Sequence, residues 1–490
     1  MSTHDRRSFL KTAGLGLIAL PAAARANGVF DPLNTRLAPE TDGIHFTTGF
    51  KISEVTPHSA MLWTRLCSQA TPNPIVHERR EIIFRHPIDF DENQPVESMD
   101  GGVRGAAGIV RAKLSNDTET FVSEWVTASP DEDYSAKFIF DQLTSGTDYR
   151  VELEAKASPS ERSWFATGRF RTAPDPQAQR AVSFVTSTCQ YFWSFDDNER
   201  GFKVYDSMRR LQPDFYVHTG DYVYYDKPGP LATTLEKARH KWCAMDSRPA
   251  IRDLLREVPI YMLKDDHDLL KNDVDATSTP HGQLSYADGL KVWREHVPLM
   301  GKPYRTFQWG LDLQIWLIEG REYRSNNDDP DGPDKSIWGE EQIQWFRETV
   351  AASTATFKLL ISPTPIVGPD RDTKKDNHAN KTFYTEGSWL RKYLATLEGL
   401  FVISGDRHWQ YFSEDPDTGL LEFGSGPVSD FHAQGWNPDD VRPAHRFLRV
   451  KGGFLHIHVR RESGKPCITF NHCNVDGNIV HTYTQFANLK

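Results

Sequence analysis

Five short apolar runs, rich in Val, Ile, Leu, Phe and Tyr and bounded by turn-forming residues, constrain this 490-residue chain more than any other feature. Runs of this length and composition predict buried β-strands. Four of the five runs end at side chains that bind metals or transfer protons, namely Cys189, Asp221 with Tyr224, the cluster 265–268, and Asp406 with His408. Open α/β sheets bind ligands beyond the carboxyl ends of their strands. The recurrence therefore predicts a metal-dependent hydrolase.

The first 26 residues have the composition of a secretion signal. The pair Arg6-Arg7 precedes an apolar stretch, 13–24, and then Ala24-Arg25-Ala26. This order predicts a twin-arginine signal cut after Ala26. The apolar stretch is shorter than the roughly 20 residues that span a bilayer, and a basic start to a membrane anchor is the alternative. We expect an exported protein, periplasmic or secreted, that uses the twin-arginine translocation machinery and has no transmembrane segment in the mature chain.

Composition and charge exclude several classes of protein. The chain is 38% hydrophobic and 25% charged, which is ordinary for a globular protein. Removing the signal changes the formal net charge from −10 to −13. An acidic protein of this kind is a poor partner for nucleic acid or an anionic membrane. Phosphate substrates remain compatible with it, because bound cations would set the local field.

Cysteine usage argues against a disulfide framework. The five cysteines form an odd, sparse set. Cys467 and Cys473 are predicted to share one strand, which would place their Cα atoms roughly 20 Å apart, beyond the reach of a disulfide. Twin-arginine export carries folded proteins, so a metal could be inserted before export and a thiolate ligand at Cys189 retained.

The alternation of residues divides the chain into two further regions. From about Ile44 to Thr172 apolar and polar residues alternate, which predicts a β-sandwich domain over residues 27–175. The runs 143–153 and 170–174 resemble the end of a fibronectin type III-like module. Residues 176–490 predict strands alternating with helices and hence a layered α/β domain. The expected helices cover 200–211, 233–245 and 340–352, and a hairpin is expected at Asp476-Gly477.

The residue types at the strand ends suit metal ligands. Asp221 and Tyr224 lie three residues apart on a tight turn, so both can face one cation, and a phenolate favours Fe(III). Cys189 alone would more often be a buried, small apolar side chain than a ligand. Its position after the first strand favours a ligand.

The other two strand ends predict a second ligand set and a proton donor. A core does not normally tolerate the cluster 265–268. In it Asp266 suits a metal ligand, and His267 suits a proton donor to a leaving group. Asp406 and His408 occupy alternate positions and can face one site. A solvated acidic loop and a simple Asp–His pair are the alternatives.

Three further polar residues are candidates for contact with a phosphate or a metal. Arg321 and Arg324 follow a sixth expected strand, and guanidinium groups bind phosphate oxygens. A salt-bridging role is equally compatible with either. Asn272 follows the acidic cluster and could ligate a metal, contact phosphate or cap a loop.

The ordered motifs T-C-Q, G-D-Y-V-Y, D-D-H-D, R-E-Y-R, W-G-E-E-Q and G-D-R-H resemble those of the alkaline phosphatase D (PhoD-like) family of metallophosphatases. The resemblance implies a four-layered α/β/β/α catalytic domain preceded by the β-sandwich. It implies Fe(III) on Cys189, Asp221, Tyr224 and His408. It further implies a second metal, Ca²⁺ or another divalent ion, on Asp221, Asp266 and Asp406.

These observations together predict an exported phosphoesterase. We expect hydrolysis of phosphomonoesters or phosphodiesters by direct attack of metal-bound water or hydroxide, without a covalent phosphoenzyme. The substrate would be a small phosphate ester or a polymer or lipid phosphodiester. A phospholipase D-type or wall-polymer phosphodiesterase is one alternative, and a non-catalytic cell-surface binding protein on the same scaffold is another.

Overall fold

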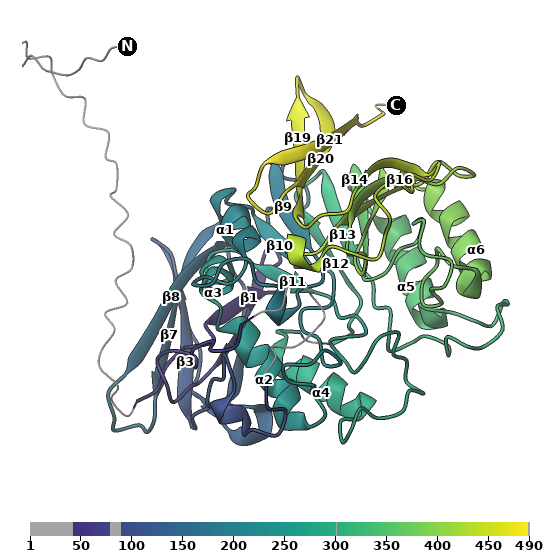
Figure 1. Cartoon of the computed structure of the whole chain (residues 1–490). Coiled ribbons are helices and arrows are strands. Elements are labelled where there is room, and N and C mark those ends of the chain that lie inside the picture. Colours follow the sequence, from purple (N-terminus) through teal and green to yellow (C-terminus); the bar gives the residue numbers. More distant parts are fainter. Residues whose placement is uncertain (1–42, 79–89, 300, 489–490) are drawn as a thin grey trace, which may run out of the picture. The chain divides into compact units, whose positions relative to one another are not determined.

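A computed structural model describes residues 43–78, 90–299 and 301–488, which belong to one compact unit, Glu40–Lys490 (Figure 1). The predicted signal segment 1–26 lies outside these residues. Within the described part of the chain, no helix combines the length and apolar character needed to cross a membrane. All five cysteines belong to that part, and each is buried with a free thiol.

The first three apolar runs form parallel strands β9 (Val182–Ser187), β10 (Phe215–His218) and β11 (Ile260–Met262). Their sheet also contains β1 (Phe50–Ser53), β2 (Ser59–Arg65), β6 (Ser135–Asp141), β19 (Phe454–Glu462), β20 (Lys465–Cys473) and β21 (Ile479–Phe486). The nine strands follow the order β21-β20-β19-β9-β10-β11-β1-β2-β6. The predicted hairpin at Asp476-Gly477 is confirmed, because it joins the antiparallel strands β20 and β21.

The other two apolar runs form β14 (Phe357–Ser362) and β15 (Leu400–Ser404) in a second sheet. The remaining strands of this sheet are β12 (Arg305–Trp309), β13 (Leu313–Leu317), β16 (Gln410–Glu414), β17 (Leu421–Ser425) and β18 (His445–Arg449). The order is β12-β13-β14-β15-β17-β16-β18, and β13, β14, β15 and β17 are parallel. Parallel strands present their carboxyl ends at one edge of the sheet.

Helices cover the outer face of each sheet. The first group, α1 (Lys203–Arg210), α2 (Leu235–Asp246), α3 (Pro249–Leu255) and α4 (Tyr286–His296), packs on the nine-stranded sheet. Helices α5 (Gly339–Ala352) and α6 (Tyr384–Ala395) pack on the seven-stranded sheet, on the opposite side of the molecule (Figure 1). The three predicted helices are thus confirmed as α1, α2 and α5, and the chain has the expected mixed α/β fold with several sheets.

Local sequence explains where two of these helices begin. The Thr234 side chain accepts a hydrogen bond from the Lys237 N–H at the start of α2. Ser285 and Asp288 form a reciprocal capping box at the start of α4. Short 3-10 helices are described at Val96–Ser98 (η1), Pro130–Glu132 (η2), Phe192–Ser194 (η3), Lys381–Phe383 (η4) and Asp430–His432 (η5).

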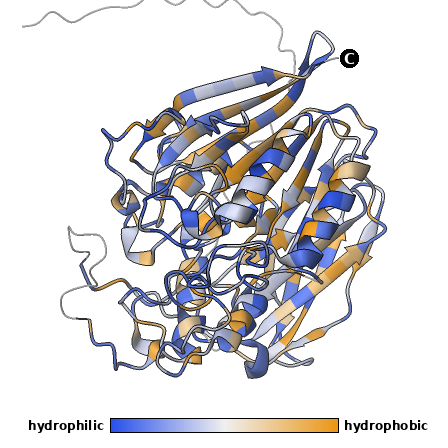
Figure 2. Ribbon diagram, turned by 90° about the vertical axis from the view of Figure 1, so that its right-hand side faces the viewer, coloured by the Kyte–Doolittle hydropathy of each residue, from blue (hydrophilic) through white to orange (hydrophobic). Residues whose placement is uncertain are grey.

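The inner faces of the two sheets form one apolar core. Figure 2 shows that hydrophobic residues concentrate on the strands, whereas the loops are mostly hydrophilic. At the centre of the core, Phe423 of β17 stacks on Phe470 of β20 with ring centroids 3.9 Å apart. Phe412 of β16 stacks on the other side of Phe423 at 4.6 Å. The contact between Phe423 and Phe470 joins the two sheets face to face, and Phe412 extends the stack within the seven-stranded sheet.

The N-terminal strands form two antiparallel layers. Strands β1, β2 and β6 make one layer, and β1 pairs with the parallel strand β11 through a single register pair, Ser53 with Ile260. The other layer has the order β4-β3-β7-β8, with β5 paired to β3. Its members are β3 (Gly108–Ser115), β4 (Thr120–Val122), β5 (Val126–Ala128), β7 (Asp148–Lys156) and β8 (Trp164–Arg171). Buried residues alternate along β3, as the sequence predicted.

The stacked core generates a stability prediction. Phe423→Ala should lower the free energy of unfolding by about 3–5 kcal/mol, because it removes a fully buried ring from the contact between the sheets. The measurement is denaturant unfolding followed by circular dichroism. Phe165→Ala, at a position 57% exposed on β8, is the control and should change stability by less than about 0.5 kcal/mol. Equal effects of the two substitutions would contradict this account of the core.

Candidate metal centre

The ends of four parallel strands bring the predicted metal donors together. Cys189 lies two residues after β9, and Asp221 lies three residues after β10. The cluster 265–268 follows β11, and Asp406 follows β15 of the other sheet. The loop after β15 contacts the loop after β9 of the other sheet. The Asp406 N–H donates a hydrogen bond to Thr188 Oγ1 at 3.3 Å. The crevice expected beyond the strand ends is therefore built from both sheets.

Three of these donors have left-handed backbone conformations. The φ angles of Cys189, Asp221 and Asp406 are 53°, 58° and 60°. This region costs a residue other than glycine roughly 1–2 kcal/mol. Strained backbone two or three residues after each of three strands is typical of functional sites, where surrounding contacts hold the strained conformation in place.

Asp268 holds the strained turn at Asp221. Its carboxylate is fully buried and accepts hydrogen bonds from the backbone N–H groups of Asp221 at 2.7 Å, Val223 at 3.0 Å and Asp265 at 3.0 Å. Burial raises the pKa of Asp268 to about 6. The last acid of the D-D-H-D motif is therefore a positioning residue, and it belongs to none of the donor groups around Asp221.

One donor group gathers four predicted ligands. Donor atoms of Cys189, Asp221 and His408 all lie within 4.8 Å of one another. The Cys189 thiol donates to Asp221 Oδ2 at 3.4 Å, and the Tyr224 hydroxyl donates to the same oxygen at 3.0 Å. The Tyr224 oxygen lies 3.3 Å from His408 Nε2. Thiol, carboxylate, phenol and imidazole thus converge on one point.

Asp221 also belongs to two neighbouring donor groups. It lies with Asp266 and His267 in one and with Asp265 and Asp406 in the other, again within 4.8 Å. Its Oδ1 atom is buried and has no hydrogen-bond partner among the described residues. A carboxylate shared among these three groups is compatible with the bridging position expected of Asp221.

The electrostatics of these groups fit a cation. Burial, reinforced by nearby carboxylates, raises the pKa of Asp221 well above its ordinary value. Burial likewise raises the pKa of the Cys189 thiol and of the Tyr224 phenol. A metal ion among the donors favours their ionised forms and offsets this cost. The residues present therefore suit a metal ion.

His267 lies beside this centre and is held by a carboxylate. Its Nδ1 atom lies 2.7 Å from Asp226 Oδ1, and its ring lies 4.3 Å from the Tyr224 ring. Burial lowers the pKa of His267, but Asp226, Asp266 and Asp221 outweigh it and raise the value to about 10. The contact with Asp226 leaves Nε2 as the nitrogen that can face a ligand.

Comparison with known proteins identifies the family of this chain. Residues 184–451 match the family model described as PhoD-like phosphatase, which is more than half of the chain. The chain belongs to the PhoD-like phosphatase family. The resemblance inferred from the motifs is thus confirmed. Alkaline phosphatase D of Bacillus subtilis (strain 168) is 24% identical over 406 residues, which cover 73% of this chain and 62% of that protein.

Solved structures show the same fold. A structure of PhoD superposes with a TM-score of 0.71 at 16% identity and covers 92% of each chain. Purple acid phosphatase PPD1 from yellow lupin (Lupinus luteus) seeds superposes with a TM-score of 0.59 at 10% identity, covering 89% of this chain and 73% of that one. Both matches show that this chain shares its fold with those proteins.

The two arginines predicted to bind phosphate lie deeper than expected. Arg321 is 0% exposed, and its guanidinium pairs with Asp265 at 2.5 Å and Asp376 at 3.2 Å. The contacts of Arg321 are thus with carboxylates of the acidic cluster and of the loop that contains Asp376, whose charge it offsets. Arg324 is also buried; it donates to the Asp376 carbonyl, whereas its Nε and Nη1 atoms have no hydrogen-bond partner among the described residues.

Asn272 lies on an exposed loop after the acidic cluster. Its backbone N–H donates to Asp226 Oδ2 at 3.0 Å, beside the oxygen that contacts His267. Asn272 therefore contacts Asp226 through its backbone N–H, and this hydrogen bond helps to orient Asp226.

Several residues of the centre escaped sequence reasoning. His432 of η5 is buried, with its ring centroid 4.2 Å from that of His408 and its Nδ1 atom 3.1 Å from the Cys189 carbonyl oxygen. Asp376 belongs to a further donor group with Asp266 and Asp273. Both missed residues lie in long loops without a strand-end signal. Asp226, by contrast, lies only two residues after Tyr224 and could have been included.

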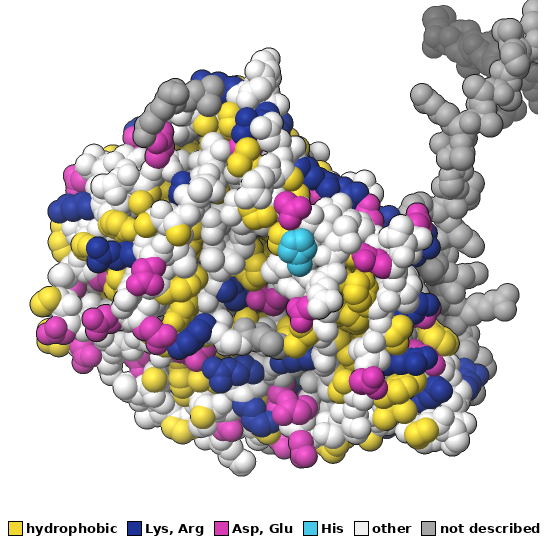
Figure 3. Space-filling view, turned by 180° about the vertical axis from the view of Figure 1, so that it is seen from behind, with side chains coloured by type: hydrophobic (Ala, Val, Ile, Leu, Met, Phe, Trp, Pro, Cys, Tyr) yellow, Lys and Arg dark blue, Asp and Glu magenta, His cyan; other side chains and the backbone are white. Residues whose placement is uncertain are grey.

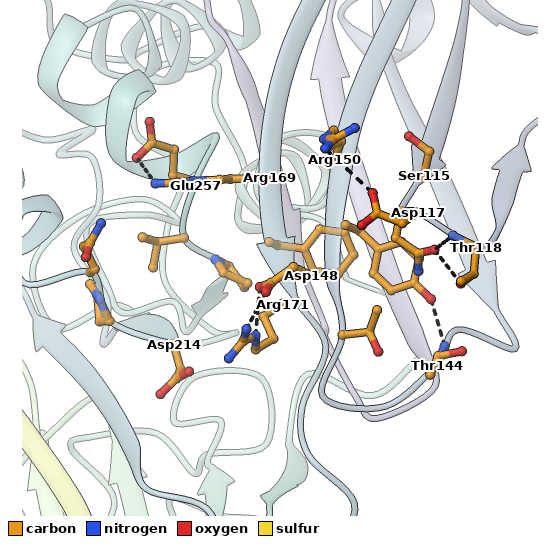
Figure 4. A pocket seen from close by; sticks show the side chains of 18 of the residues that line it. Ser115, Asp117, Thr118, Thr144, Asp148, Arg150, Arg169, Arg171, Asp214 and Glu257 are labelled. Carbon is orange, nitrogen blue, oxygen red and sulfur yellow. Dashed lines mark hydrogen bonds and ion pairs between the residues drawn. The ribbon is translucent and has the colours of Figure 1, made fainter. Parts of the chain in front are cut away.

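One groove lies away from the metal donors and does not mark the chemistry. It measures about 810 Å³ and runs between the N-terminal strands and the loops after α1 and α3 (Figure 4). Its charges are largely paired, as in Arg171 with Asp148 and Arg209 with Glu257. On the face seen in Figure 3, acidic and basic side chains are likewise interspersed.

The role of Asp268 can be tested directly. Asp268→Asn should lower the free energy of unfolding by about 1–3 kcal/mol, since an amide nitrogen would oppose backbone N–H donors that now bind a carboxylate. The same change should reduce the metal content, because the turn that presents Asp221 loses its support. Denaturant unfolding and elemental analysis measure the two effects. Asp117→Asn, with a side chain 94% exposed, is the matched control, and a mutant that behaves like this control would refute the role.

Proposed function

We propose that this chain is a metal-dependent phosphoric ester hydrolase that acts on phosphomonoesters, phosphodiesters or both. Membership of the PhoD-like family supports the reaction class. The observation that carries the proposal is the position of Asp221 in three donor groups at once. One carboxylate shared between two ligand sets is what a site for two metal ions requires.

The donor types distinguish the two sides of Asp221. Cys189, Tyr224 and His408 would hold Fe(III), to which a phenolate is a strong donor. Asp266 and Asp406 offer only carboxylate oxygens and would hold Ca²⁺ or another divalent ion. When bound, the ions supply Lewis acidity toward phosphoryl oxygens and activate water.

The protein residues have separable tasks. Asp406 and His408 are only partly buried, so the centre opens on the loop after β15. His267, held by Asp226, would donate a proton from Nε2 to the leaving oxygen. Arg321 and Lys374 would offset the negative charge of the buried carboxylates near the metal donors, since both form ion pairs with Asp376.

Export and domain organisation complete the proposal. Residues 1–26 would direct twin-arginine export to the periplasm or medium, after which the mature chain starts near residue 27. Residues 27–175 would form a fibronectin type III-like module, and residues 176–490 would form the catalytic domain.

One contact supports the proposed N-terminal module. The Thr144 N–H donates a hydrogen bond to the Tyr149 hydroxyl, a contact typical of the tyrosine corner in such sandwiches.

His267→Ala should lower turnover by about 10²–10⁴-fold while leaving metal content unchanged, because the residue donates a proton instead of anchoring a cation. The loss should be smaller for 4-nitrophenyl phosphate than for an alkyl phosphate, whose leaving group needs protonation. Bis(4-nitrophenyl) phosphate assayed in parallel gives the diester preference.

His58→Ala, at an exposed position in the turn between β1 and β2, is the control and should retain wild-type turnover. Loss of metal in the His267 variant would show that this residue is a ligand. A metal-loaded wild-type protein inactive on all three esters would reject the hydrolase and favour the binding protein on the same scaffold.

A further inference from the structure

The loop of residues 363–380 leaves its sheet at the edge where the metal donors lie. It follows β14, which is parallel to β15, and the last residues of the two strands, Ser362 and Ser404, are register partners. The loop after β15 carries Asp406 and His408. Both loops therefore start side by side at the same edge of the sheet.

Buried polar groups fix the course of this loop. Glu422 of β17 is 0% exposed and accepts hydrogen bonds from the consecutive backbone N–H groups of residues 366–368, at 2.7, 2.8 and 3.1 Å. Further along the loop, Asp370 accepts hydrogen bonds from Arg407 Nη1 at 2.9 Å and from Asn377 Nδ2 at 2.8 Å. The residues that follow Asp370 are thus presented from an anchored backbone.

Arg371 is an accessible cation on this anchored loop. Its side chain is 39% exposed, whereas those of Arg321 and Arg407 are 0% and 1% exposed. Its Nε atom lies 3.6 Å from Asp370 Oδ1 and has no hydrogen-bond partner among the described residues. The Asp370 carboxylate is already hydrogen-bonded by Arg407 and by Asn377. The Arg371 guanidinium can therefore take another acceptor.

The guanidinium of Arg371 lies beside the neighbours of His408. Its Cζ atom is 5.8 Å from the centroid of the Trp409 ring, within the range of a cation–π contact. A Cβ atom at Gly435 would lie only 3.1 Å from Arg371 Nη1. The preceding Gln434 N–H donates to the His408 carbonyl oxygen at 3.2 Å. The guanidinium is thus held next to the metal donors by residues adjacent to one of them.

The charges around Arg371 leave room for an anion. Asp370 lies beside both Arg371 and Arg407, and Arg407 also pairs with Asp406. The next acid along the loop, Asp372, is 87% exposed and pairs with a different arginine. When Asp406 binds a metal ion, two guanidinium groups share Asp370, which leaves one positive charge for an anion.

The chemistry of phosphate esters suggests what this cation recognises. Guanidinium groups bind phosphate oxygens through parallel N–H donors. A phosphomonoester offers three acceptor oxygens and carries up to two negative charges. A phosphodiester has one such oxygen fewer and a single charge. A cation beside the metal ions therefore has an additional oxygen and an additional charge to bind only in a monoester.

We propose that Arg371 binds a non-bridging oxygen of the phosphoryl group and so favours phosphomonoesters over phosphodiesters. The inference rests on the proposed hydrolase function and names the substrate class of the same site. Arg371 is in this role a substrate-binding residue, because it contacts the phosphoryl group and no metal ion.

Kinetics with two esters test the proposal. Arg371→Gln should lower kcat/KM for 4-nitrophenyl phosphate by about 10- to 100-fold, as expected for the loss of a hydrogen bond to a charged group. For bis(4-nitrophenyl) phosphate the change should stay below about threefold. Arg371→Lys keeps the charge but not the fork of donors, and it should recover part of the loss. The matched control, Arg446→Gln, removes a guanidinium that is 54% exposed on β18 and should leave both activities unchanged.

Binding of inorganic phosphate gives a readout that does not depend on turnover. In isothermal titration calorimetry of the metal-loaded full chain, Arg371→Gln should bind phosphate at least about 10-fold more weakly than wild type. Elemental analysis should show unchanged metal content. Equal losses on the two esters, loss of metal, or equal phosphate affinity would each overturn the role of Arg371. A wild-type protein that binds phosphate through Arg371 but hydrolyses neither ester would reject the hydrolase function and the ester preference, and would retain the phosphate contact.

Discussion

The face-to-face packing of the two sheets is the constraint on which the rest of the structure depends. Phe423 from one sheet and Phe470 from the other stack at 3.9 Å in a shared apolar core. This contact aligns the carboxyl ends of β9 and β10 with that of β15, so that Cys189 and Asp221 from one sheet meet His408 from the other. A slip of one residue in either register would turn alternate side chains away from the crevice.

Without a bound ion, the backbone conformation and the crowded charges of the centre at that edge lower the stability of the folded chain. Three of its donors occupy left-handed backbone, and carboxylates crowd around the shared Asp221. Buried basic groups, above all Arg321 against Asp265 and Asp376, compensate part of the charge. Because metal binds a preformed set of donors only in the folded state, metal binding and folding should be coupled. The strain and the charge are thus consistent with a site organised for cations.

Sequence reasoning located most of this centre because its signal is local. Cys189, Asp221 and Asp406 each follow an apolar run by two or three residues. A short stretch of sequence therefore indicates both the strand and the donor. His432 and Asp376 carry no such signal, since long loops bring them to the site through tertiary packing. The depth of Arg321 was equally hidden, because the sequence does not reveal which carboxylates enclose it. Likewise, strand alternation predicted antiparallel N-terminal layers but not that β1 would pair with β11.

The visible absorption spectrum of the purified, active protein tests the central claim most directly. If Cys189 and Tyr224 hold Fe(III) beside a divalent ion, charge transfer from thiolate and phenolate should give a broad visible band. Tyr224→Phe should shift or remove part of this band, and Cys189→Ser should reduce iron retention. A chelator that removes only the divalent ion should abolish activity and leave much of the colour. A colourless, fully active protein that contains only divalent metals would contradict the claim.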